Sequence, residues 1–267
     1  MKCVSILAAE AETRELSLPA SATSCSIRIP TLNNKGSMIT RECEQFTEFI
    51  KVATLPNSRV LEIGSAFGFV ALKALSKGAS DYTANDACED HLRILAKSVM
   101  DTYPDRHDNV HLLPGRFPEV ATLLASESYD AILAANILQF LTNDELVEAF
   151  SQFRRLLKPG GKLFLSMLTA FADFLPKEFL ISFNANVVPI KNLEDFQNYP
   201  GFIPSLKAID SALTDDSFFA FNIDVTKFLL KREHFAVDYC DYDWTKSMRP
   251  WKTDGRETLI AVAKKEQ

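Results

Sequence analysis

The chain reads Val60-Leu61-Glu62-Ile63-Gly64-Ser65-Ala66-Phe67-Gly68-Phe69 over residues 60–69. The first four residues form a short, mainly apolar run, as expected of a strand buried on both faces. Small residues follow at positions 64–66 and 68, residues 70–75 have helical composition, and Gly78 can close that helix. A strand, a glycine turn and a helix form the first unit of a doubly wound α/β sheet. Its ligand lies across the carboxyl end of the strand, against the helix N-terminus.

The spacing of the small residues distinguishes between two classes of ligand. A dinucleotide-binding turn has the pattern G-x-G-x-x-G. Counting from Gly64, this chain has Ala66 and Phe69 at the second and third glycine positions. A pyrophosphate group would approach such a turn poorly, which disfavours a nicotinamide-dependent oxidoreductase.

The series Glu62-x-Gly64-x-Ala66-x-Gly68 resembles the first motif of class I S-adenosylmethionine-dependent methyltransferases, usually E-x-G-x-G-x-G. Ala66 departs from that motif by one methyl group. The turn Leu157-Lys158-Pro159-Gly160-Gly161, before an apolar strand, is also similar to this family. The resemblance covers about residues 55–168 and implies a Rossmann-like core with S-adenosylmethionine as cofactor.

An acidic residue ends the second predicted strand, residues 81–85. Asp86 lies 22 positions after Gly64 (86 minus 64), and a carboxylate there can accept hydrogen bonds from both ribose hydroxyls of a nucleoside. Glu89 and Asp90 begin the next predicted helix, where acids are common because of the helix dipole. Asp86 is therefore the predicted ribose ligand.

The turn after the third predicted strand, residues 110–113, contains Gly115, Arg116 and Phe117. Members of the family often carry an acid here that receives the adenine amino group. An arginine cannot accept a hydrogen bond. Arg116 would therefore stack on the base, or leave recognition to backbone groups and Phe117; the alternative is an ordinary surface arginine.

The fourth predicted strand, residues 129–135, ends at Asn136, at the edge that faces the transferring methyl group in this family. Gln139 brings a second amide there. The predicted cofactor-binding residues are Glu62, Gly64, Ser65, Ala66, Gly68, Asp86, Ala87, Gly115, Arg116, Phe117 and Asn136.

No catalytic residue is assigned. Methyl transfer from a sulfonium is an in-line displacement of a good leaving group, so alignment and desolvation supply much of the rate. A general base helps only a protonated acceptor. Asn136 and Gln139 are candidates for orienting the acceptor, and Tyr199, Asp241 and Tyr242 are weaker ones.

Residues 169–225 interrupt the strand–helix alternation with a segment rich in phenylalanine. It carries three lysines and eight acids, a balance of −5 (3 minus 8). Because segments after the fifth strand commonly recognise substrate in this family, we expect a substrate cover; a packed elaboration or a dimer surface is the alternative. The acidic balance favours a neutral or cationic acceptor, such as an amine.

Four segments are expected. Residues 1–54 form an N-terminal segment with a covering helix over 37–53, residues 55–168 the cofactor-binding core, and residues 169–225 the cover. Residues 226–267 complete the core with a helix and two strands, an antiparallel edge hairpin in the resembled family. The predicted fold class is α/β, a doubly wound, mostly parallel seven-stranded sheet with helices on both faces.

The composition, 47% hydrophobic and 24% charged over 267 residues, is that of an ordinary globular protein. A net charge of −6 and a pI of about 5.3 disfavour a general nucleic-acid binder.

Five scattered cysteines without a C-x-x-C pair, and histidines without ligand spacing, indicate neither a metal site nor a disulfide framework. The sequence contains no run of 18 apolar residues, so no membrane span is expected. Residues 3–9 are apolar but acids follow at once, so we expect a cytoplasmic protein rather than export.

Three functions remain open at this point. The first is a methyltransferase acting on a small molecule or a protein. The second is a cofactor-binding fold used for interaction without catalysis, which Ala66 and Arg116 keep open. The third is an NAD(P)-dependent oxidoreductase. The acceptor and the oligomeric state are not determined by the sequence.

Overall fold

The structure, a computed structural model, describes residues 1–19, 28–208, 215–245 and 255–266. It divides into two compact units. The first comprises Met1–Leu133 and Leu156–Gly161, and the second comprises Ala134–Arg155 and Lys162–Gln267. Each unit is described by itself below.

One seven-stranded sheet has the order β10-β11-β7-β6-β3-β4-β5. Its strands are β3 (Val60–Ile63), β4 (Tyr82–Asp86), β5 (Val110–Pro114), β6 (Tyr129–Ala135), β7 (Leu157–Leu168), β10 (Phe235–Tyr242) and β11 (Thr258–Lys265). Strand β4 pairs in parallel with β3 and β5, whereas β11 pairs antiparallel with β7 and β10. This arrangement confirms the predicted class, a mostly parallel α/β sheet with an antiparallel hairpin at the C-terminal edge.

Helices and short elements connect these strands. The α-helices are α1 (Val4–Thr13), α2 (Glu44–Ala53), α3 (Phe69–Ser76), α4 (Glu89–Thr102), α5 (Asn143–Leu156), α6 (Lys177–Asn186), α7 (Leu193–Gln197) and α8 (Ile223–Arg232). The short 3-10 helices are η1 (Pro104–Asn109), η2 (Glu119–Leu123), η3 (Leu138–Phe140) and η4 (Leu206–Ala208), and the short strands are β1 (Arg28–Pro30), β2 (Ser37–Ile39), β8 (Phe202–Ile203) and β9 (Phe218–Phe219). Within the described ranges, no helix has both the length and the apolar character needed to cross a membrane.

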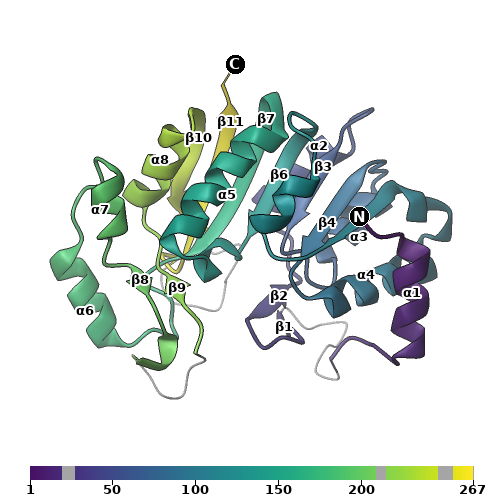
Figure 1. Cartoon of the computed structure of the whole chain (residues 1–267), viewed down its shortest axis with the longest axis horizontal. Helices are drawn as coiled ribbons and strands as arrows, with labels where there is room; N and C mark the ends of the chain where they lie inside the picture. Colours follow the sequence, from purple (N-terminus) through teal and green to yellow (C-terminus); the bar gives the residue numbers. More distant parts are fainter. Residues whose placement is uncertain (20–27, 209–214, 246–254, 267) are drawn as a thin grey trace. The chain divides into compact units, whose positions relative to one another are not determined.

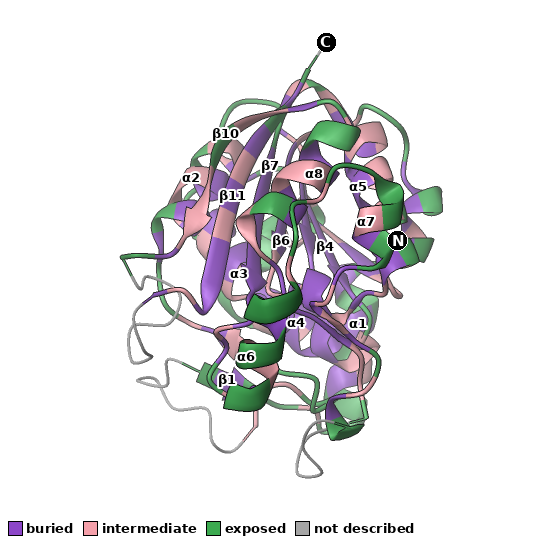
Figure 2. Ribbon diagram, turned by 90° about the vertical axis from the view of Figure 1, so that its left-hand side faces the viewer, coloured by how far each residue is buried: buried purple, intermediate pink, exposed green. Residues whose placement is uncertain are grey.

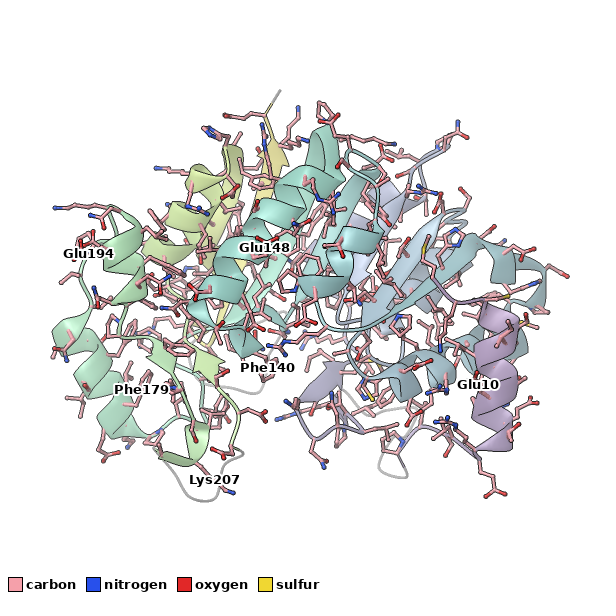
Figure 3. The ribbon with its side chains drawn as sticks, in the orientation of Figure 1. Glu10, Phe140, Glu148, Phe179, Glu194 and Lys207 are labelled. Carbon is pink, nitrogen blue, oxygen red and sulfur yellow. The ribbon has the colours of Figure 1, made fainter. Side chains whose placement is uncertain are left out.

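The first unit buries every residue of β3, in agreement with the short apolar run at residues 60–63, and also every residue of the more polar β4. Helix α1 packs along α4 (Figure 1). The guanidinium Nε of Arg93 on α4 donates to Glu10 on α1 at 2.7 Å, and Figure 3 labels Glu10 on that helix. Helix α1 is absent from the sequence-based expectations. Its stripe of Val4, Leu7, Ala8 and Ala11 is buried.

The predicted helix over residues 37–53 is wrong in its first part. Ser37–Ile39 forms β2, which pairs antiparallel with β1, and α2 begins only at Glu44. The β1–β2 hairpin is closed by the Thr31 amide, which donates to the Gly36 carbonyl at 3.1 Å. Gly36 has φ of 143°, a conformation that glycine adopts readily and that ends the turn, and the β-branched Ile39 favours a strand after it.

In the second unit, residues 169–225 fold into α6, α7 and a two-stranded sheet of β8 and β9. Five of the nine phenylalanines in this segment are buried, and the other four are half-buried: Phe183, Phe196, Phe218, Phe219 and Phe221, then Phe171, Phe174, Phe179 and Phe202. The ring of Phe219 lies 5.8 Å from that of Phe196 and 5.2 Å from that of Tyr199, measured between centroids. The segment therefore has its own aromatic core, while α6 is largely exposed (Figure 2).

The turn before α3 requires a glycine for two reasons, which a pair of variants can separate. Gly68 has φ of 84°, and an added Cβ would lie 2.1 Å from Leu95 Cδ1 on α4; Gly78 has φ of 101° but open space around that position. We expect Gly78→Ala to lower the free energy of unfolding by about 1 kcal/mol through backbone strain. Gly68→Ala should cost about 1–3 kcal/mol more, because the buried Leu95 must move. Urea unfolding of both variants checks this, and equal losses would contradict the contact with Leu95.

Candidate cofactor and acceptor sites

The turn after β3 is closed by backbone hydrogen bonds to β4. The amides of Gly64 and Ser65 both donate to the Asn85 carbonyl at 2.9 Å, and the Gly68 amide donates to the Ser65 carbonyl at 2.9 Å. Gly64, Ala66 and Gly68 have φ of 74°, 47° and 84°, so all three lie in the left-handed region. This geometry explains the small residues of the motif. An alanine at the middle position costs about 1 kcal/mol relative to glycine.

The Asp86 carboxylate fastens this turn to the end of β4. Its Oδ2 accepts from the Ala66 amide at 2.8 Å, and its Oδ1 accepts from the Cys88 amide at 2.8 Å. Oδ1 also pairs with His91 Nδ1 at 3.0 Å. Asp86 is only 7% exposed. A carboxylate has about four acceptor positions, so about one remains, on Oδ2. The expectation of two ribose hydrogen bonds therefore exceeds what this carboxylate can accept without losing a present partner.

His91 is a residue that the sequence-based reasoning missed at this site. Its ring is 1% exposed and lies edge-on to Phe67, with centroids 4.9 Å apart. Its Nε2 accepts from the Leu32 amide at 3.1 Å, which leaves Nδ1 to donate to Asp86. The sequence signal was weak, because a single histidine on a helix is more often a packed core residue than part of a site.

The turn after β5 lies beside the end of β4. The Asn85 side-chain amide donates to the carbonyls of Leu113 at 2.7 Å and Gly115 at 2.9 Å, and the Gly115 amide donates to the Asp86 carbonyl at 3.0 Å. Phe117 is buried, whereas Arg116 is partly exposed. The three turns after β3, β4 and β5 therefore lie at one edge of the first unit, as the parallel pairing dictates. The roles of these residues toward adenine stay predictions.

Glu62, the first residue of the motif, lies inside the unit. It is buried, and its Oε2 accepts from the Tyr82 hydroxyl at 2.6 Å. Burial, together with the charge of Asp86, raises the pKa of this carboxyl to about 8, although the hydrogen bond from Tyr82 lowers it. The structure therefore gives Glu62 a buried partner inside the fold.

Three buried side chains of the first unit have polar atoms without a hydrogen-bond partner among the described residues: Gln45 (Oε1 and Nε2), Ser58 (Oγ) and Ser65 (Oγ). Ser58 precedes β3, at the other end of that strand from the glycine turn. Gln45 lies in the first turn of α2 next to Phe46, whose ring centroid is 6.5 Å from that of Phe69 at the start of α3. Because buried polar groups normally find partners, Ser65 and Gln45 fit a polar ligand at this turn. Gln45 was detectable in the sequence as a polar residue in the apolar stripe of a helix.

In the second unit, Asn136 follows β6 with φ of 55°, and its backbone N–H donates to the Ser166 backbone carbonyl at 2.8 Å. The side-chain Nε2 of Gln139 donates to the backbone carbonyl of Asn136 at 2.7 Å. The side-chain oxygens Asn136 Oδ1 and Gln139 Oε1 are buried and have no partner in the described part of the chain. Tyr199 is different, because its buried hydroxyl donates to the Ala220 carbonyl at 2.9 Å and thus has a structural role.

Aromatic rings gather after β7 in this unit. The Arg256 guanidinium carbon lies 4.0 Å from the ring centroid of Phe171, and Tyr242 stands edge-on to Phe171 at 6.0 Å. The Tyr242 and Trp244 rings are 5.6 Å apart. We name Phe171, Tyr242, Trp244 and Arg256 the β7-end aromatic group. In the described residues, no group of three or more His, Cys, Asp or Glu side chains has an arrangement that could hold a metal ion.

The chain matches one protein-family model and resembles many solved structures in its fold. Residues 60–161 match the model of a family described as a methyltransferase domain. No curated protein matches the chain.

Three solved structures illustrate the fold. An S-adenosylmethionine-dependent methyltransferase from Mesorhizobium loti is 18% identical with a TM-score of 0.57, covering 82% of this chain and 97% of its own. Another from Methanosarcina mazei is 17% identical with a TM-score of 0.55, covering 80% and 95%. A 1,6-didemethyltoxoflavin-N1-methyltransferase from Burkholderia thailandensis, with S-adenosylhomocysteine bound, is 15% identical with a TM-score of 0.53, covering 84% and 79%. At these identities the likeness shows the fold.

The buried carboxyl of Glu62 predicts a pH dependence. Its pKa is about 8 in the folded chain and near 4.5 in the unfolded chain, so between these values the folded state holds more protons and its stability falls as pH rises. In Glu62→Gln this titration is absent. The unfolding free energy of the variant relative to wild type should therefore increase by about 1.4 kcal/mol per pH unit inside that window. Urea unfolding at pH 5.5, 6.5 and 7.5 measures it, with the exposed Glu119→Gln as control. Parallel curves for Glu62→Gln and wild type would contradict the assignment.

Proposed function

We propose that this chain, whose residues 60–161 match a methyltransferase domain, is a class I, Rossmann-like methyltransferase that uses S-adenosylmethionine and methylates a small-molecule acceptor. The observation that carries the assignment of the site is the turn after β3. There, left-handed backbone at residues 64, 66 and 68, an unpaired Ser65 hydroxyl and a free acceptor position on Asp86 occur together.

We propose that the cofactor is held in the first unit by the turns after β3, β4 and β5. Asp86 Oδ2 accepts one ribose hydroxyl. Ser65 and the start of α3 bind polar groups of the ligand, where amides of a helix N-terminus are unsatisfied. Gly115, Arg116 and Phe117 line the adenine. When bound, the cofactor supplies an electrophilic methyl group on a sulfonium. Glu62 contributes through the fold, because its carboxyl is paired with Tyr82.

The acceptor is proposed to bind in the second unit. Asn136 Oδ1 and Gln139 Oε1 are available hydrogen-bond acceptors, suited to orient an N–H or O–H group. The half-buried rings of Phe171 and Tyr242, with the exposed ring of Trp244 beside them, exclude water from an apolar or aromatic acceptor body. The acidic balance of residues 169–225 supports a neutral or cationic acceptor, and we propose this segment as the substrate cover of a cytoplasmic enzyme. The structurally similar protein from Burkholderia thailandensis is a 1,6-didemethyltoxoflavin-N1-methyltransferase with 1,6-didemethyltoxoflavin bound, which supports an acceptor of this size.

Ligand titration tests this function directly. We expect calorimetry to show binding of S-adenosylmethionine and S-adenosylhomocysteine and none of NAD or NADP. Incubation with methyl-labelled cofactor and a metabolite extract should then give a labelled product of low mass. Label in protein alone would move the acceptor to the protein class. Cofactor binding without any transfer would favour a cofactor-binding fold used for interaction.

Substitution of Asp86 should affect both binding and folding. In Asp86→Asn, an NH2 group that can only donate replaces one carboxylate oxygen. The variant therefore loses either the proposed hydrogen bond from the ribose hydroxyl or a hydrogen bond from one of the three present donors. A hydrogen bond to a charged group contributes about 1.5–3 kcal/mol, which corresponds to about 10- to 150-fold in the dissociation constant. Asp90→Ala is the control, because Asp90 pairs with Arg93 and Arg14 instead. Calorimetry and melting temperature check both variants. An unchanged affinity in folded Asp86→Asn would place the ribose elsewhere.

The β7-end aromatic group gives an acceptor-specific prediction. Phe171→Leu keeps an apolar side chain but removes the ring, so we expect a several-fold rise in KM for the acceptor, as for a contribution of about 1 kcal/mol from one aromatic contact. The dissociation constant of S-adenosylmethionine should stay within a few-fold of wild type. Phe183→Leu, in the buried aromatic core of the same segment, is the control that lowers stability without raising KM. A loss of cofactor affinity in Phe171→Leu would contradict the separation of the two sites.

A further inference from the structure

A buried histidine joins the predicted ribose ligand to the N-terminal hairpin. His91 Nδ1 donates to Asp86 Oδ1 at 3.0 Å, and His91 Nε2 accepts from the Leu32 amide at 3.1 Å. Leu32 lies in the turn between β1 and β2. One imidazole therefore connects a carboxylate at the end of β4 with the turn at Leu32, which lies 59 residues before His91 in the chain.

Apolar contacts hold the same hairpin in the same place. Ile29 of β1 is buried in a cluster with Phe67 of the glycine turn and Ile94 of α4, and Leu16 and Met38 pack against this cluster. Phe67 also lies edge-on to the His91 ring. The hairpin, the glycine turn and the start of α4 therefore share one small core, in which His91 supplies the polar connection.

The hydrogen bonds fix the protonation form of the ring. An imidazole that accepts at Nε2 and donates at Nδ1 is neutral, with its proton on Nδ1. In that form it saturates Oδ1, which already accepts from the Cys88 amide. The remaining acceptor position is then confined to Oδ2, next to the Ala66 amide of the glycine turn. His91 thus determines which oxygen of Asp86 is left for a ligand.

We propose that His91 is a positioning residue of this enzyme: it orients Asp86 for the cofactor ribose and couples that carboxylate to docking of the β1–β2 hairpin. This inference rests on the proposed cofactor site. Cofactor binding and hairpin docking are then coupled, since both depend on one ring, and ligand binding protects the Leu32 amide from hydrogen exchange although Leu32 is not itself a cofactor ligand.

Three variants separate the two hydrogen bonds. In His91→Asn the side-chain nitrogen can occupy the place of Nδ1 and donate to Asp86, but nothing reaches Leu32. In His91→Gln the side-chain oxygen can reach the Leu32 amide, but the donor to Asp86 is lost. His91→Leu removes both. Val99→Ala, at a fully buried position of α4 without a contact to Asp86, is the control for lost stability alone.

Calorimetry with S-adenosylhomocysteine and hydrogen exchange at Leu32 are measured on all five proteins, below their melting temperatures. We expect His91→Leu and His91→Gln to weaken binding about tenfold, and His91→Asn to restore it to within about threefold of wild type. Leu32 should exchange faster in His91→Asn and His91→Leu than in His91→Gln. Val99→Ala should bind as wild type does.

Other outcomes overturn the proposal. Equal affinity in wild type and His91→Leu, or equal weakening in His91→Asn and His91→Leu at matched melting temperature, would show that His91 does not position Asp86. Leu32 exchange that is the same in all variants would remove the coupling to the hairpin. If the wild type itself binds no S-adenosylhomocysteine, the proposed cofactor site fails together with the positioning role. The exchange data then still decide whether His91 holds the hairpin.

Discussion

The hydrogen bonds of the Asp86 carboxylate hold together three segments of the first unit. One oxygen accepts from the glycine turn after β3, and the other accepts from the start of α4 and from His91. Charge-assisted hydrogen bonds of this kind are short and strong, and a buried amide left without its partner costs about 1–3 kcal/mol. The shape of the turn and the orientation of the carboxylate therefore depend on each other.

A second buried acid lies close in the sequence to this arrangement, and the two carboxyls are in different states. Burial and the charge of Asp86 raise the pKa of Glu62 to about 8, so at neutral pH its carboxyl is mostly protonated. The Tyr82 hydroxyl donates to one of its oxygens. Glu62 therefore has a structural partner inside the unit, whereas Asp86 accepts hydrogen bonds from three donors at the end of β4.

The second unit has a different organisation. Residues 169–225 bury most of their phenylalanines against one another, and Tyr199 uses its hydroxyl to bind the Ala220 carbonyl. The side-chain oxygens of Asn136 and Gln139, directly after β6, are buried without a partner among the described residues, as are side-chain oxygens of Asn143, Ser166 and Thr258. In the proposed acceptor site, the amide oxygens of Asn136 and Gln139 and the half-buried rings of Phe171 and Tyr242 support orientation of the acceptor and exclusion of water. Both are suited to a reaction whose leaving group needs little assistance.

The sequence by itself determined the order of strands and helices in the core. The motif at residues 60–69, the acid at Asp86 and the turn at residues 157–161 are local patterns. The methyltransferase resemblance rested on these patterns, and the family match over residues 60–161 confirms it. The start of α5 is also locally encoded, because Thr142 and Glu145 have the spacing of a capping box: the Glu145 amide donates to Thr142 Oγ1 at 3.3 Å and the Thr142 amide donates to Glu145 Oε2 at 2.8 Å.

Only the tertiary structure decided which hydrogen-bond donors pair with which acceptors. Periodicity cannot show that Ser37–Ile39 pairs with Arg28–Pro30 instead of extending α2, because the pairing partner is a separate segment. It cannot show that Asp86 already has three donors, since two of them come from Ala66 and His91 on other elements. Nor does it distinguish Gln45 and Ser65, with unpaired polar atoms, from other polar residues. Hydrogen-bond saturation depends on which groups meet in space, and that is settled only when the chain is folded.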